Sequence, residues 1–105
     1  MSEVLASAGY AVRTAADGEA ALNAIRIAAD PPDLVLLDLL LPRLAGREVL
    51  RVLGADHRAI PVVVVTGIDP EPGDLVELSG VKSVLRKPVA ASDLLAAVRT
   101  HVRAR

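Results

Sequence analysis

The sequence contains no cysteine, phenylalanine or tryptophan, and its single aromatic residue is Tyr10. Without cysteine the chain forms neither a disulfide bond nor a thiolate metal site, which fits a reducing compartment. The core must therefore be built from Ala, Val, Leu and Ile, which make up nearly all of the 52% of residues that are hydrophobic. Aliphatic side chains of this kind suit a parallel sheet that is buried by helices on both faces.

The sequence also lacks a strong net charge and a long apolar run. A formal net charge of −1 provides no overall positive field to favour nucleic acid or a membrane surface. The longest apolar run, residues 34–41, is interrupted by Asp38 and is too short to span a bilayer. Residues 1–8 lack the basic start and long apolar stretch of a secretory signal. We therefore expect residues 1–105 to form a single cytoplasmic domain, with no membrane or direct nucleic-acid partner.

Four stretches of the sequence are predicted to be strands of a parallel sheet. Residues 33–38 and 61–66 are continuous apolar runs, which is typical of parallel strands that are buried on both faces. Residues 11–15 and 82–85 are weaker candidates. Between the predicted strands, apolar residues recur at helical spacing. Helices are expected over residues 17–28, 44–53 and 71–79, and over a last segment with Ser92 as its N-cap. This alternation predicts an α/β fold with helices on both faces of the sheet.

Three polar residues lie where predicted strands end. Asp38 and Thr66 close the two apolar strands, and Lys87 follows the last strand. Because functional groups in such sheets collect at the carboxyl ends of the strands, we expect these three side chains to converge. Together they suit a carboxylate that accepts a phosphoryl group, with Asp38 as nucleophile and Thr66 and Lys87 holding the oxygens. Each residue taken alone also has an ordinary explanation. Asp38 could cap a turn, Thr66 could be a β-branched strand end, and Lys87 could be a surface lysine.

These residues belong to an ordered set of short motifs that resembles the receiver domains of two-component response regulators, which are chemotaxis-Y-like. The motifs occur in the family's order, with appropriate gaps, from about residue 5 to the C-terminus. They are Ala8-Gly9-Tyr10-Ala11-Val12, Ala16-Asp17-Gly18-Glu19-Ala20-Ala21-Leu22, Pro32-Asp33-Leu34-Val35-Leu36-Leu37-Asp38, Leu41-Pro42, Ala45-Gly46, Ile60-Pro61-Val62-Val63-Val64-Val65-Thr66-Gly67 and Arg86-Lys87-Pro88.

The resemblance implies a flavodoxin-like fold and phosphorylation of Asp38 by a histidine kinase, a phosphotransfer protein or a small phosphodonor. It further implies that Mg²⁺ binds at the acceptor, with a ligand from the backbone carbonyl of Leu40. In the family, Thr66 and Lys87 bind the phosphoryl group, and a cis peptide bond joins Lys87 to Pro88. Such a domain is not an enzyme beyond its self-catalysed phosphotransfer and dephosphorylation.

The sequence departs from the family pattern at its beginning. The family starts with a hydrophobic strand followed by an acidic pair that binds Mg²⁺, whereas this sequence begins in the helix after that strand. We therefore expect a truncated receiver with four strands in the chain, weak or absent Mg²⁺ binding and impaired phosphorylation. Loss of a central strand would leave open edges and an apolar groove. We favour a homodimer as the way in which these edges and the groove are covered. The alternative is direct pairing of residues 11–15 with residues 33–38.

A second departure is Val84, where the family usually has an aromatic residue that moves on phosphorylation, so the usual switch is not expected. The alternative to a phosphorylated receiver is a phosphorylation-independent interaction or oligomerisation module derived from one. An enzyme with an aspartyl nucleophile is disfavoured because no second general-acid carboxylate accompanies Asp38 in its loop. His57 and His101 belong to no cluster of metal-binding residue types, so no transition-metal site is expected.

Overall fold

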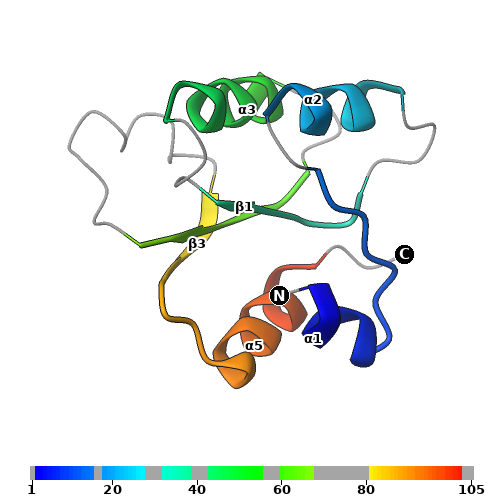
Figure 1. The fold of residues 1–105 in the computed structure, drawn as a ribbon, viewed down its shortest axis with the longest axis vertical. Coiled ribbons are helices and arrows are strands. Elements are labelled where there is room, and N and C mark those ends of the chain that lie inside the picture. The colour runs from blue at the N-terminus through cyan, green and yellow to red at the C-terminus, as the bar shows by residue number, and fades with distance from the viewer. Residues whose placement is uncertain are drawn as a thin grey trace.

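The computed structural model describes residues 2–15, 18–27, 32–38, 43–55, 60–67 and 81–102. These residues form a parallel sheet between two layers of helices (Figure 1). The elements are α1 (Ser2–Ser7), α2 (Gly18–Ile27), β1 (Val35–Asp38), α3 (Arg43–Ala55), β2 (Val62–Thr66), β3 (Val81–Arg86) and α5 (Ala91–His101). The predicted α/β class, a parallel sheet flanked by helices, is confirmed. The predicted helix over residues 71–79 lies outside the described residues.

The sheet has the strand order β1-β2-β3, and both pairs of neighbours are parallel. All five residues of β2 are buried, which explains why this strand needs an unbroken run of valines: helices cover both of its faces. In the register of the ladders, Asp38 lies beside Val65 and Thr66 lies beside Arg86. The carboxyl ends of the three strands therefore meet at one edge of the sheet.

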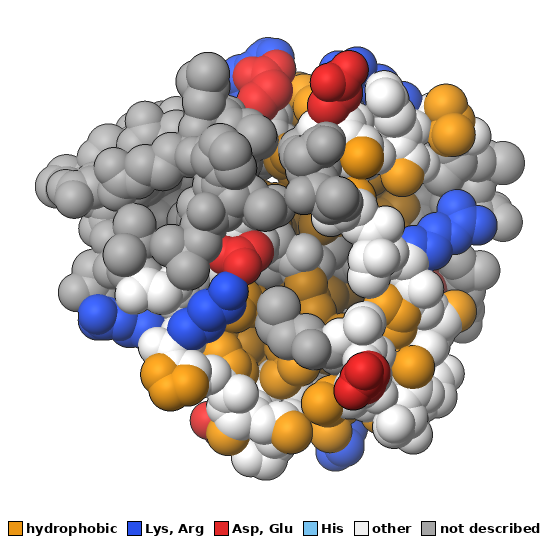
Figure 2. Space-filling model, in the orientation of Figure 1, with side chains coloured by type: hydrophobic (Ala, Val, Ile, Leu, Met, Phe, Trp, Pro, Cys, Tyr) orange, Lys and Arg blue, Asp and Glu red, His pale blue; other side chains and the backbone are white. Residues whose placement is uncertain are grey.

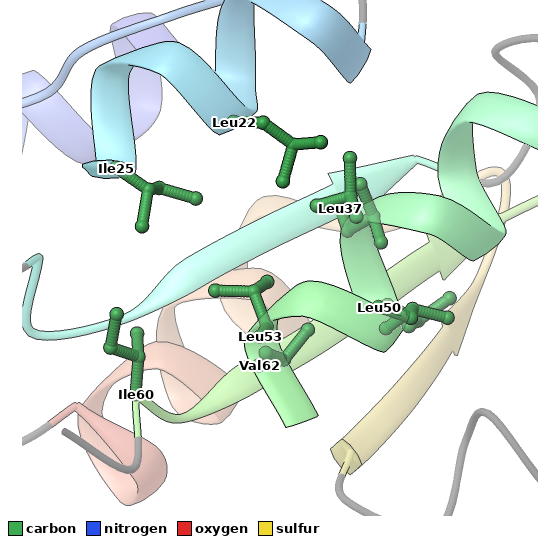
Figure 3. Close-up of a cluster of buried hydrophobic side chains, with 9 residues drawn as sticks. Leu22, Ile25, Leu37, Leu50, Leu53, Ile60 and Val62 are labelled. Atoms are coloured by element: carbon green, nitrogen blue, oxygen red, sulfur yellow. The ribbon is translucent and has the colours of Figure 1, made fainter. Parts of the chain in front are cut away.

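Two clusters of hydrophobic side chains hold the layers together. On one face, α2 and α3 pack against β1 and β2 through residues such as Leu22, Leu53 and Leu37 (Figure 3). On the other face, α1 and α5 pack together through Leu5 and Leu94, with smaller contributions from the strands. Each helix buries one side because its apolar residues recur at helical spacing.

The structure differs from the prediction at residues 11–15, which form no strand. A parallel strand exists only where a neighbouring backbone completes its hydrogen-bond ladder. The described sheet ends at β1, so the prediction of a strand at residues 11–15 was wrong. The described residues give three strands instead of four, and the proposed direct pairing of residues 11–15 with β1 is not formed. Val12 from this segment nevertheless packs against the cluster under α1 and α5.

Candidate functional site

The sheet places the three predicted site residues at its carboxyl edge. Asp38 is the last residue of β1, Thr66 is the last residue of β2, and Lys87 directly follows β3. Each position follows from the local sequence, because each apolar or β-branched run stops at that point. The parallel arrangement then brings together residues that are far apart in the chain.

Asp38 and Lys87 form a direct ion pair. The Lys87 Nζ donates a hydrogen bond to the Asp38 Oδ2 over 2.6 Å, although 49 residues separate them in the sequence. The side chains are 35% exposed for Lys87 and 26% exposed for Asp38. A charge-assisted hydrogen bond of this length orients the carboxylate, while its partial exposure leaves it accessible from solvent.

Thr66 lies deeper than the ion pair. It is 1% exposed and is the one polar residue among the fully buried side chains of the described part. Its backbone carbonyl accepts a hydrogen bond from the backbone N–H of Lys87 over 2.8 Å, which ties the residue after β3 to the end of β2. The peptide bond between Lys87 and Pro88 is cis, as the resemblance implies.

The described residues do not fit a tightly bound Mg²⁺ ion. Within the ranges that the structure describes, no group of three or more His, Cys, Asp or Glu side chains could hold a metal ion. The Oδ2 atom of Asp38 is already bound to Lys87. Leu40, whose carbonyl was predicted to bind the metal, lies outside the described residues. Mg²⁺ normally needs one or two carboxylates besides phosphate oxygens and water, and at this edge the described residues offer the Asp38 carboxylate, which is already paired with Lys87.

The remaining sequence predictions concern Val84, His101 and His57. Val84, which the resemblance aligns with an aromatic residue of the family, is an exposed residue of β3. His101 ends α5 and is half-buried, and His57 lies outside the described residues. Sequence analysis did not single out Lys82 and Arg86, the exposed cations that flank Val84 in β3.

The chain matches the family model of the response regulator receiver domain over residues 1–99. It belongs to the response regulator receiver domain family. Response regulator MprA from Mycolicibacterium vanbaalenii is 41% identical over 96 residues, which cover 90% of this chain and 41% of that protein. Response regulator MprA from Mycobacterium tuberculosis is 40% identical over 96 residues, with the same coverage. The receiver thus spans about two fifths of the length of these curated relatives.

Solved receiver structures have the same fold. A CheY-like receiver domain protein from Methanospirillum hungatei has a TM-score of 0.82 and 27% identity, and the match covers 94% of this chain and 78% of that one. TrrA from Thermotoga maritima, solved in complex with Mg²⁺ and BeF, has a TM-score of 0.82 and 25% identity, with 95% and 84% covered. The predicted receiver family and its flavodoxin-like fold are therefore confirmed. In the part of this receiver that the structure describes, no helix is long and apolar enough to cross a membrane.

Proposed function

We propose that this receiver is the phosphoacceptor of a two-component phosphorelay, with Asp38 as the acceptor residue. A histidine kinase, a phosphotransfer protein or a small acyl phosphate is the donor. The observation that carries this proposal is the pairing of Lys87 with Asp38 at the edge where the parallel strands end. The pairing supports the proposal because a carboxylate that is partly open to solvent then lies beside a cation that can offset the charge of an incoming phosphoryl group.

The reaction needs few protein groups. An Asp38 carboxylate oxygen attacks the phosphorus and forms a new P–O bond. The P–N bond of a donor phosphohistidine, or the P–O bond of an acyl phosphate, breaks, and its electron pair leaves with the donor. Lys87 offsets the negative charge that gathers on the phosphoryl oxygens, and the Thr66 hydroxyl hydrogen-bonds one of them. Water later hydrolyses the aspartyl phosphate, so phosphotransfer and dephosphorylation are both self-catalysed.

We also propose that Mg²⁺ binds weakly or not at all and that phosphorylation is slow. The Asp38 carboxylate is engaged by Lys87, and the described residues supply no group of further acidic ligands. Repulsion between Asp38 and an anionic donor is then offset by Lys87 alone, which slows the attack.

We further propose that the receiver is a cytoplasmic homodimer. The strand β1 pairs with β2 on one side and with no described strand on the other. Leu34 and Leu36 remain half-buried at this open edge. Hydrophobic side chains are also visible between charged ones of both signs on the face shown in Figure 2. Association of two copies would remove such apolar surface from water.

Incubation with acetyl phosphate and Mg²⁺, followed by intact-mass spectrometry, tests the phosphoacceptor proposal. The wild-type receiver is expected to gain the mass of one phosphoryl group slowly, and the Asp38→Asn variant is expected to gain none. Asp33→Asn is the matched control, because Asp33 precedes β1 at the opposite end of the strand. Equal modification of the wild type and Asp38→Asn, or no modification of the wild type, would contradict the proposal.

A further inference from the structure

The cation that contacts the Asp38 carboxylate belongs to the protein itself. The Nζ atom of Lys87 lies 2.6 Å from the Oδ2 atom of Asp38, in a contact that is both a hydrogen bond and an ion pair. A metal ion on the same oxygen would compete with this hydrogen bond and would lie close to a like charge. The ammonium group therefore opposes the binding of a divalent ion to Asp38.

The backbone fixes the position of this ammonium group. Lys87 directly follows β3, and its N–H donates a hydrogen bond to the Thr66 carbonyl over 2.8 Å. In the ladder between β1 and β2, Asp38 lies beside Val65, which precedes Thr66. The end of β2 therefore connects Lys87 to Asp38 through the sheet. Anchoring of the backbone lowers the conformational entropy that Lys87 loses when it pairs with Asp38, so the cation is in place before a phosphodonor binds.

The groups near this ion pair do not fit a divalent metal. Across the ranges that the structure describes, no three His, Cys, Asp or Glu side chains lie together as a possible metal site. The Thr66 carbonyl, another oxygen at this edge, accepts the hydrogen bond from Lys87. Mg²⁺ demands near-octahedral oxygen ligands and gives up water reluctantly, so one carboxylate that is paired with an ammonium group holds it poorly. The site thus departs from the Mg²⁺ site that the family resemblance implies.

We propose that neither the phosphorylation of Asp38 nor the hydrolysis of its aspartyl phosphate depends on Mg²⁺, because the Lys87 ammonium serves as the counter-ion instead of a metal. This inference rests on the proposed phosphoacceptor function and adds its ion requirement. In phosphorylation, an Asp38 oxygen forms the new bond to phosphorus while the donor departs with the electron pair of the broken bond. In hydrolysis, water attacks the phosphorus, its oxygen and protons leave with inorganic phosphate, and the electron pair of the broken P–O bond returns to the Asp38 carboxylate. Lys87 offsets the charge on the phosphoryl oxygens in both steps.

Intact-mass spectrometry of the full receiver with acetyl phosphate, in excess Mg²⁺ and in excess EDTA, tests the ion requirement. We expect the rates of phosphorylation in the two solutions to agree within about threefold, and likewise the rates at which the phosphoryl group is lost after removal of the donor. A larger fall of either rate in EDTA would overturn the inference while leaving Asp38 as the acceptor. If no mass gain occurs in either solution, the phosphoacceptor function fails, and this inference fails with it.

Titration of the ¹⁵N-labelled receiver with Mg²⁺ provides a readout besides activity. We expect weak or no saturable NMR shifts of the Asp38 and Lys87 amides in the wild type. Lys87→Met, which removes the ammonium group from the Asp38 carboxylate, should bind Mg²⁺ about tenfold or more tightly than the wild type. If this variant does not fold, Lys87→Gln replaces it.

Lys82→Met is the matched control for the Mg²⁺ titration. It makes the same change in net charge at an exposed position of β3, so it should bind Mg²⁺ like the wild type. Equal Mg²⁺ affinity of the wild type and the Lys87 variant, or no binding by either protein, would refute the role assigned to Lys87.

Discussion

Lys87 makes two contacts at the carboxyl edge of the sheet. Its ammonium group binds Asp38, and its backbone N–H binds Thr66. The ion pair brings a positive charge to Asp38, and the backbone hydrogen bond fixes the position of Lys87. Removing the side chain therefore tests the charge without removing the backbone contact.

We expect the substitution Lys87→Met to slow phosphorylation of Asp38 by about 10²–10³-fold, because it removes a cation aimed at the developing negative charge. The cost in folding stability should stay below about 1 kcal/mol, since the ion pair is partly exposed to solvent. Rates of mass gain with acetyl phosphate measure the first effect, and denaturant unfolding measures the second. Lys82→Met is the control, because Lys82 is an exposed lysine at the start of the same strand. A rate unchanged from the wild type would show that Lys87 does not act at the acceptor.

The contact between Glu48 and Arg51 on α3 provides a second test at the scale of single residues. The hydrogen bond from Arg51 lowers the pKa of the Glu48 carboxyl, and the same contact raises the pKa of Arg51. Because the Glu48 pKa is lower in the folded state, the pair contributes stability above the unfolded pKa and loses it as pH falls through the folded pKa. The contribution is small, because the pair is exposed to solvent.

The substitution Glu48→Gln should therefore lower the free energy of unfolding slightly at about pH 7 and by less at about pH 3, because the charge of Glu48 is lost progressively as the pH falls through its folded pKa. Urea unfolding at the two pH values measures this difference. A loss of stability that is the same at both values would mean that Glu48 acts by something other than its charge.

At the scale of elements, α5 begins differently from its prediction. Ser92 was expected to cap this helix, but the helix begins at Ala91 and the N-cap position belongs to Ala90. That prediction was wrong. Ala90 has extended backbone angles and makes no side-chain capping hydrogen bond. The first backbone N–H groups of α5 therefore lack the side-chain acceptor that an N-cap serine would supply.

Ala90→Ser should stabilise the receiver by about 0.5–1 kcal/mol, because the new hydroxyl can accept a hydrogen bond from the first turn of α5. Thermal and urea unfolding measure the gain. Ala96→Ser is the matched control, since Ala96 is exposed inside the same helix, where serine gives no capping bond and lowers helix propensity. Destabilisation by Ala90→Ser would show that the start of α5 is set by other contacts.

At the scale of the whole molecule, the two edges of the sheet differ in character. The β3 edge presents Lys82 and Arg86, whereas the β1 edge presents Leu34 and Leu36 as half-buried leucines. Charged residues on an edge strand discourage pairing with further strands, and an apolar edge invites it. We therefore place the homodimer contact at the β1 side of the molecule.

Sedimentation equilibrium at micromolar concentration should show a dimer, and the melting temperature should rise with protein concentration. Leu34→Lys should shift the equilibrium toward the monomer by placing a charge at the open edge. Ile27→Lys is the control, because Ile27 is exposed at the end of α2 and does not belong to β1. The homodimer would be contradicted if the wild-type receiver sediments as a monomer and melts cooperatively at a temperature that does not depend on protein concentration.

The sequence by itself determined the features that depend on neighbouring residues in the chain. The apolar runs ending at Asp38 and Thr66 predicted two buried strands, and β1 and β2 lie within them. The alternation of strands and helices predicted the layered parallel sheet, and the ordered motifs identified the receiver family. These inferences succeeded because burial on both faces and helical spacing leave local patterns.

Only the tertiary structure decided the features that need two distant segments. Residues 11–15 have the composition of a strand, but a strand also needs a neighbouring backbone, and the described residues provide none beside this segment. The contact between Lys87 and Asp38 likewise spans 49 residues, and the spacing of the motifs could place both residues at one edge without showing that they touch. In each case the deciding interaction lies outside the local sequence.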